Sequence, residues 1–377
     1  MLKAMMEENG VRRREVRQVI NEEHLESWFK SHNSRASRYL YILGLGFDQR
    51  MCEGITRFRA IGVSFDVWII HYSEGEASPS KAYMEQVEQN KTRLLEIIKD
   101  LNVKEIQIDF WVDNEEEYVE EQKQGRFVGE INATKVIKNA KNELAMYTDI
   151  ILDISALPQS VYLCMINALF KCDIPNQKLN IIVNENYSTD MIIDPVQPEE
   201  TAHELQGFYS TLDVTDDIVI WYPFLGEKNI PYLRKYYEYL KSPSHDIDEI
   251  CPVVPFPAVN ARRADSIISD YSKNLFDIWN IDKKNILYVS ETNPLLICRN
   301  LYEATKNYKH ALEPLGKCKF VFSAITSKLM TIGMFMAAYD LKEDGYNIVI
   351  LNISNKGYEI KNDTIVNTPN RLICLSV

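Results

Sequence analysis

The chain has 377 residues, of which 46% are hydrophobic and 25% are charged. This composition is typical of globular proteins and unlike that of disordered chains, and the length accommodates two domains of ordinary size. The formal net charge of −12 argues against extended nucleic-acid binding, because neutralising phosphates along a strand needs clustered Lys and Arg.

Two sequence features predict a cytoplasmic protein. No apolar run reaches the roughly 18 residues of a membrane-spanning helix, and the start of the chain lacks the apolar stretch of a secretory signal. The cysteines are scattered singly, with no CxxC pair and no zinc-like pairing with His, so we expect buried thiols in a reducing compartment. They are Cys52, Cys164, Cys172, Cys251, Cys298, Cys318 and Cys374.

Residues 1–38 form a charged N-terminal segment that we expect to be helical. Its bases precede its acids, a pattern that indicates either a solvated helix or one that docks a protein partner or a second copy of the chain. Contact with nucleic acid is the alternative interpretation. The charged residues are Arg12, Arg13, Arg14, Arg17, Glu22, Glu23 and Glu26.

From residue 39 onward, short β-branched and aromatic runs alternate with longer amphipathic segments. This alternation predicts βα units, a mostly parallel sheet and an α/β fold. Residues 39–185 are the first Rossmann-like domain, with helices expected between its strands. The expected strands are 39–45, 64–71, 103–112, 149–154 and 179–183.

Residues 186–216, with few apolar residues in register, are interpreted as a linker, and residues 217–377 as a second Rossmann-like domain with C-terminal edge strands. Aligning Ile150–Asp153 with Phe320–Ser323, an offset of 170 residues, also matches the apolar helices that follow. An ancient duplication and chance similarity between two buried βα units both explain this match. The strands expected in the second domain are 217–222, 251–254, 285–289, 319–322 and 346–353.

The loop 323–328 carries the strongest indication of a ligand site. In a parallel sheet, ligands bind at the carboxyl ends of strands, where helix N-termini offer N–H groups to anions. Hydroxyls of Ser323, Thr326 and Ser327 would hold a phosphate while Lys328 supplies positive charge. The alternative is that Ser323 or Thr326 only caps the helix. The loop is not a P-loop, because GxxxxGK[ST] is absent.

Gly44 and Gly46 resemble the start of a dinucleotide fingerprint, but Gln49 stands where the third glycine is expected. Two glycines still let a backbone approach a ligand closely, with Asp48 on a ribose hydroxyl and Arg50 on a phosphate. A tight turn with an Asp cap explains the same residues.

The other candidate ligand contacts follow further strands. A buried strand-end carboxylate is costly unless it is hydrogen-bonded or functional, so Asp153 is either a helix cap or a ligand contact. Arg262 and Arg263 open a helix, an unfavourable place for cations that favours a nearby phosphate. The remaining candidates are Ser155, Glu227, Lys228 and Asn293.

Motifs for metal-dependent or serine-hydrolase catalysis are missing from the sequence. The histidines show no HxxxH or HExxH spacing, and no GxSxG elbow is present, so neither a metal site nor a particular cofactor is predicted.

The stretch Phe320–Asp340, FVFSAITSKLMTIGMFMAAYD, resembles the strand, Thr/Lys loop and small-residue helix of the CRISPR-associated Rossmann fold (CARF) ligand-sensor family. The resemblance implies that Thr326 and Lys328 contact the phosphates of a cyclic oligonucleotide. Ala324 and Ile325 replace the glycines of the family's GGTK-like loop. No fused effector is recognisable, so the resemblance also implies a subunit of a bacterial antiviral defence system whose effector is a separate protein.

The sequence supports three hypotheses. The first is a nucleotide-binding or nucleotide-sensing regulatory protein with a cleft beside Asp48, Asp153, Asn293 and Lys328. The second is a hydrolase acting on a nucleotide or sugar phosphate, with Asp48 and Asp153 as acid and base. The third is a non-catalytic interaction subunit that docks through residues 1–38.

Overall fold

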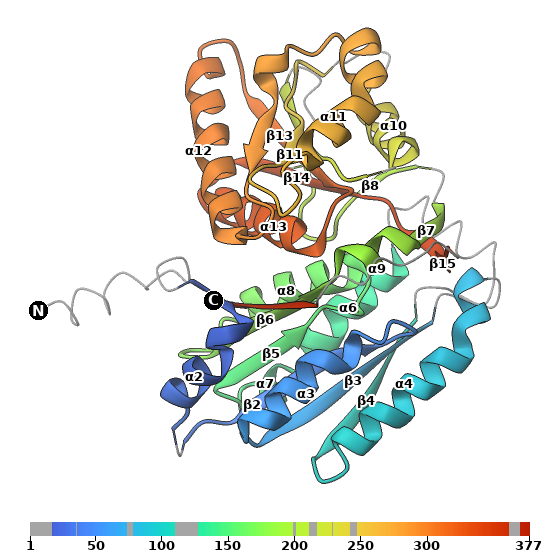
Figure 1. The fold of residues 1–377 in the computed structure, drawn as a ribbon. Coiled ribbons are helices and arrows are strands. Elements are labelled where there is room, and N and C mark those ends of the chain that lie inside the picture. The colour runs from blue at the N-terminus through green and yellow to red at the C-terminus, as the bar shows by residue number, and fades with distance from the viewer. Residues whose placement is uncertain are drawn as a thin grey trace, which may run out of the picture. The chain divides into compact units, whose positions relative to one another are not determined.

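The computed structural model describes residues 17–34, 36–73, 78–109, 127–198, 201–210, 217–227, 229–241, 247–361 and 370–377. The chain forms two compact units, of which unit 1 comprises 1–196 and 357–377 and unit 2 comprises 197–356 (Figure 1). The fold is mixed α/β with mostly parallel sheets, which confirms the predicted fold class. The N-terminal arginines Arg12, Arg13 and Arg14 lie outside the described residues.

Unit 1 is built on a sheet with the strand order β1-β16-β6-β5-β2-β3-β4. The five strands from β6 to β4 run parallel, while β16 is antiparallel to β6 and β1 is antiparallel to β16. The strands are β1 (Gln18–Asn21), β2 (Tyr39–Leu45), β3 (Phe65–Ser73), β4 (Val103–Asp109), β5 (Asp149–Asp153), β6 (Lys178–Glu185) and β16 (Arg371–Ser376).

Helices cover both faces of the unit 1 sheet, as Figure 1 shows. On one face, α2, α3 and α4 bury side chains such as Phe29, Phe58 and Leu94 against Tyr41 and Ile151. On the other, α6 packs against α8, which is buried from Val161 to Phe170. The helices are α2 (Glu22–His32), α3 (Met51–Ile61), the 3₁₀ turn η2 (Pro79–Tyr83), α4 (Met84–Ile97), α6 (Val128–Asn139), α7 (Lys141–Leu144) and α8 (Gln159–Cys172).

Unit 2 has a second sheet with the order β12-β11-β9-β13-β14-β8, and β10 also pairs with β9. All its pairs are parallel except the one between β14 and β8. The strands are β8 (His203–Glu204), β9 (Ile218–Phe224), β10 (Glu249–Ile250), β11 (Val253–Pro255), β12 (Leu287–Val289), β13 (Cys318–Ala324) and β14 (Asn347–Asn352).

The unit 2 sheet is also covered on both faces. Leu233 of α10 and Ile267 of α11 pack with Trp221 and Val321 of the sheet, whereas α12 packs against α13. The two-sided cover explains why these strands read as continuous apolar runs. The helices are α10 (Ile230–Leu240), α11 (Arg263–Ser272), the π-helical segment η3 (Lys273–Ile278), the 3₁₀ turn η4 (Lys283–Asn285), α12 (Pro294–Leu312) and α13 (Lys328–Glu343).

The two units share one strand order. If β10 and β11, which both pair with β9, are counted as one strand and the parallel strands are numbered along the chain, both sheets read 3-2-1-4-5, the order of the Rossmann fold. Both also add an antiparallel strand beside strand 5. The segments aligned at an offset of 170 residues, Ile150–Asp153 and Phe320–Ser323, both lie in the fourth strand. An ancient duplication predicts this agreement in position.

Two predicted boundaries differ from the structure. Residues 186–216 are not a bare linker, because they contain α9 (Tyr187–Ile192), β7 (Ile193–Pro198) and β8, and β7 pairs with β15 (Asn355–Ile360). The C-terminal residues from 357 belong to unit 1, where β16 pairs with β6 and β1. Pairing between strands distant in sequence decides this placement, and local composition carries no signal of it.

The described part of the charged N-terminal segment is built into unit 1. The helix expected there is present as α2, but its apolar residues Leu25 and Phe29 are buried, with Phe29 packed edge-on against Phe58. The strand β1 before it pairs with β16. The apolar side of α2 is therefore used in the protein's own core. Within the described residues, no helix has the combined length and apolarity that crossing a bilayer requires.

Candidate functional site

The predicted site residues lie at the carboxyl edges of the two sheets. Strand order reverses beside the first strand of each sheet, between β2 and β5 in unit 1 and between β9 and β13 in unit 2. In open α/β sheets such a switch point is where ligands bind. Asp48 and Asp153 belong to unit 1, whereas Asn293 and Lys328 belong to unit 2, so the single cleft beside all four stays a prediction.

The glycine loop after β2 packs closely against the protein's own chain. A Cβ on Gly44 would lie 2.6 Å from Leu157 Cδ2, and one on Gly46 would lie 2.8 Å from the hydroxyl of Tyr72. The side-chain amide of Asn90 donates to the carbonyl oxygen of Gly46 at 2.9 Å. Glycine is needed at position 44 because Leu157, in the loop after β5, approaches so closely, and at position 46 because the Tyr72 hydroxyl does.

Asp48 and Arg50 bind each other. The guanidinium of Arg50 donates to Asp48 Oδ2 at 2.8 Å through Nε and to Asp190 Oδ1 at 2.7 Å through Nη1. Burial would lower the pKa of Arg50, but the two carboxylates raise it above its ordinary value. The backbone N–H of Arg50 also donates to Asp48 Oδ1, so this aspartate closes the turn before α3. Asp190, from α9, was missed by the sequence analysis.

Asp153 lies in the core of unit 1, with 1% of its surface exposed. Its Oδ2 accepts a hydrogen bond of 2.7 Å from the Tyr41 hydroxyl, and its Oδ1 accepts one from the backbone N–H of Ser155. A Cβ on Gly54 would lie 2.4 Å from Asp153 Oδ2, so this glycine makes room for the carboxylate. Asp153 does not cap α8, whose N-cap residue is Pro158. Ser155 Oγ accepts from the backbone N–H of Asn184.

Replacing Tyr41 with Phe should lower the free energy of unfolding by about 1.5–3 kcal/mol, because a buried carboxylate oxygen loses its donor. Urea denaturation measures the change. Tyr147→Phe is the matched control, since its hydroxyl donates to Asp66 at a partly exposed position and should matter less. Equal losses in the two variants would contradict the importance given to burial.

Several polar side chains of the loop 323–328 in unit 2 have structural roles. Ser323 is buried and accepts a hydrogen bond of 2.9 Å from the indole nitrogen of Trp221. Ser327, and neither Ser323 nor Thr326, is the N-cap of α13, where its Oγ accepts from the backbone N–H of Met330. Thr326 Oγ1 lies 3.3 Å from Met330 Sδ. Lys328, partly exposed, is the first residue of the helix.

Loops that follow three different strands of unit 2 meet in a buried ion cluster of Glu227, Arg263 and Glu291. Arg263, 7% exposed, donates to Glu227 at 2.7 Å through Nε and at 2.9 Å through Nη2, and its Nη1 donates to Glu291. Burial would lower the pKa of Arg263, but the carboxylates raise it.

The sequence analysis interpreted Arg262 and Arg263 as favouring a nearby phosphate. In the structure their anionic partners are instead carboxylates of the protein itself. Glu291 completes the ion cluster from the loop after β12, and Arg262 pairs with Asp265 on the surface. Sequence reasoning detected the unusual arginine because cations are unfavourable at a helix start. It could not identify the partners, since they come from loops distant in sequence.

The remaining predicted contacts have local roles or are not described. Asn293 is the N-cap of α12, where its side-chain oxygen accepts from the backbone N–H groups of Leu295 and Leu296. Lys228 lies outside the described residues. In the part of the chain that the structure describes, no group of three His, Cys, Asp or Glu side chains is placed to hold a metal ion.

The two units repeat one arrangement at the switch point. In unit 1, Leu43 of β2 pairs with Asp153 of β5, and Tyr41, two positions before Leu43, donates to Asp153. In unit 2, Pro223 of β9 pairs with Ser323 of β13, and Trp221, two positions before Pro223, donates to Ser323. Three positions after Leu43 and Pro223 stand Gly46 and Gly226. Each of these glycines approaches the loop that follows the fourth strand.

Comparison with known proteins identifies no family. No family model matches the chain, and no curated protein matches it. Among solved structures, the glycopeptide N-methyltransferase MtfA complexed with S-adenosyl-L-methionine matches with a TM-score of 0.22 and 12% identity over 48% of this chain. This chain spans 60% of that methyltransferase.

Two universal stress proteins are also similar over a longer stretch. The putative one from Pseudomonas aeruginosa UCBPP-PA14 matches with a TM-score of 0.23 and 10% identity, over 83% of this chain and 91% of its own. The one from Archaeoglobus fulgidus DSM 4304 matches with a TM-score of 0.23 and 10% identity, over 86% and 97%. Likenesses at such scores and identities carry no functional meaning for this chain.

Proposed function

We propose that this chain binds a phosphorylated, nucleotide-type ligand at the carboxyl edge of the unit 2 sheet, and that it senses this ligand without turning it over. The ligand phosphate would lie at the N-terminus of α13, next to Thr326 and Lys328. The loop after β9 would border the ligand, because Gly226 lies against the backbone of Ile325 and Thr326.

The comparison between the two units carries this proposal. Unit 1 has Ala156, Leu157 and Pro158 at the positions where unit 2 has Thr326, Ser327 and Lys328, and both sequences build the same strand, turn and buried helix. Ser327 caps α13, but unit 1 builds the same turn with no hydroxyl or cation at the positions of Thr326 and Lys328. The presence of these two residues in unit 2 alone supports a binding role.

Electrostatics supports the same site. Lys328 is the first residue of α13, at the positive end of the helix dipole, where its charge adds to that of the helix N–H groups. A phosphate at this position would interact favourably both with the ammonium of Lys328 and with the backbone N–H groups of the first turn of α13.

The positions of the two candidate catalytic carboxylates favour sensing over hydrolysis. Asp153 is buried beneath Tyr41 and Gly54, and Asp48 is held by Arg50. A general acid or base must come within hydrogen-bond reach of the substrate. As a finer proposal, the resemblance of Phe320–Asp340 to the CARF family would make the ligand a cyclic oligonucleotide and the chain a subunit of an antiviral defence system in bacteria.

Changing Lys328 to Gln should weaken binding of a phosphorylated probe at least tenfold, which corresponds to about 1.4 kcal/mol. Native mass spectrometry of the purified protein first reports any retained small molecule and the assembly size. Calorimetry with ADP and with cyclic di-AMP then gives the affinities. Lys342→Gln, near the other end of α13, is the matched control and should leave both affinities unchanged.

Two results would contradict the proposal. Equal affinity of the Lys328→Gln variant and the unaltered protein for every probe that binds would remove this loop from the site. Release of inorganic phosphate from ADP by the unaltered protein, lost in an Asp48→Asn variant, would support the hydrolase hypothesis instead.

A further inference from the structure

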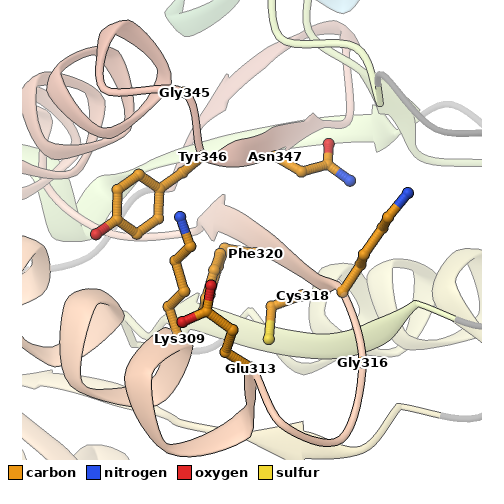
Figure 2. A pocket seen from close by; sticks show the side chains of 9 residues that line it. Lys309, Glu313, Gly316, Cys318, Phe320, Gly345, Tyr346 and Asn347 are labelled. Carbon is orange, nitrogen blue, oxygen red and sulfur yellow. The ribbon is translucent and has the colours of Figure 1, made fainter.

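A pocket of about 460 Å³ opens at the opposite edge of the unit 2 sheet, at the amino ends of β13 and β14 (Figure 2). The end of α12 and the turns that lead into the two strands enclose it. It is lined by Lys309, Glu313, Gly316, Lys317, Cys318, Phe320, Gly345, Tyr346 and Asn347. Because β13 begins at Cys318 and ends at Ala324, this pocket lies a full strand length from the Lys328 loop.

Two aromatic residues, Phe320 and Tyr346, line the pocket. Phe320 is buried in the sheet, and its ring centroid lies 6.1 Å from that of Tyr346. The sulfur of Cys318 faces the same space, as Figure 2 shows. These groups form an apolar surface against which a planar ring could pack.

Two lysines and one glutamate are the charged side chains in the lining of the pocket, and Asp217 and Asp248 lie near its Cys318 side. Lys309 holds its ammonium 4.2 Å from the centroid of the Tyr346 ring, and Lys317 adds a second cation, whereas Glu313 is the one acidic side chain in the lining. Asn347 donates to Asp217, a buried carboxylate outside the lining, at 3.4 Å. The lining therefore combines two cations with one anion.

We propose that this pocket is a second binding site and that it takes a small aromatic carboxylate, with the ring against Phe320 and Tyr346 and the carboxylate at Lys309. The volume lies within the roughly 300–1,000 Å³ of small-molecule sites, which combine apolar walls with a few polar groups. Lys309, already over the Tyr346 ring, can bind the carboxylate while the ligand ring contacts the aromatic wall.

Cys318 provides a built-in reporter of occupancy. Of the seven cysteines it alone is partly exposed, whereas the other six are buried. Burial raises the pKa of the Cys318 thiol, Lys309 lowers it, and the carboxylates of Asp217, Glu313 and Asp248 raise it further. A thiol reagent applied to the folded protein should therefore react first at Cys318.

The test follows modification of the full-length protein by N-ethylmaleimide at fixed pH, using intact-protein mass spectrometry. A Cys318→Ala variant identifies the reacting thiol. Benzoate should slow modification of Cys318 at least fivefold at saturation. The neutral amide benzamide and the cation benzylamine should need about tenfold higher concentrations for half-protection. A Lys309→Gln change should raise the benzoate concentration for half-protection about tenfold, about 1.4 kcal/mol.

The control is Lys306→Gln on the same helix, an exposed lysine outside the lining, which should leave half-protection unchanged. Comparing concentrations for half-protection, rather than rates, removes the effect of Lys309 on the thiol itself. Failure of benzoate to protect, stronger protection by benzylamine, or equal half-protection in the Lys309→Gln variant would each overturn the proposal. None of these results bears on ADP binding near Lys328.

Discussion

Replacing Arg263 with Met is expected to lower the free energy of unfolding by about 3–5 kcal/mol, the usual cost of breaking a buried ion pair on one side. The methionine keeps most of the side-chain volume, but Glu227 and Glu291 lose their cation while they remain in the protein interior. Urea denaturation gives the total loss, and amide hydrogen exchange of peptides from β9 and β12 locates it in unit 2.

Two further variants separate charge from packing in this ion cluster. Arg262→Met removes the neighbouring arginine, whose side chain is 84% exposed and pairs with Asp265, so it should leave the free energy of unfolding nearly unchanged. Combining Arg263→Met with Glu227→Gln and Glu291→Gln should restore much of the lost stability, because no buried charge then stays unpaired. A loss no greater for Arg263→Met than for Arg262→Met would contradict the assigned role.

Replacing Gly226 with Ala is expected to destabilise unit 2 by about 3 kcal/mol, at the upper end of what overpacking usually costs. The added Cβ would lie 2.3 Å from the carbonyl oxygen of Ile325 and 3.0 Å from the Cα of Thr326. Both contacts are with backbone, which cannot rotate away as a side chain does. The loops after β9 and β13 must therefore separate.

The control for the glycine change is Gly345→Ala. Gly345 has φ +82 with nothing within 4 Å of an added Cβ, so only the left-handed backbone resists alanine, at about 1 kcal/mol. Hydrogen exchange of peptides from β9 and β13 should rise in the Gly226 variant and stay near its original rate in the control. Equal exchange in both variants would show that the loops accommodate the extra carbon.

The sequence by itself determined the α/β class and the chain positions of most elements. Runs such as Tyr39–Leu45 and Phe320–Phe322 are apolar throughout because both faces of their sheets are covered, and this signal is local. It also placed Asp48, Asp153 and Lys328 at or shortly after the ends of strands, since the end of an apolar run marks where a strand ends.

Only the tertiary structure decided what those polar groups contact. Tyr41 reaches Asp153, Trp221 reaches Ser323, and Arg263 collects carboxylates from two other loops, all through pairings between residues distant along the chain. The same holds for β16, which joins unit 1 although it follows unit 2 in sequence, and for the pocket beside Lys309. A local pattern determines which face of an element is apolar, but the free energy of pairing distant strands and side chains determines which neighbour each polar group meets.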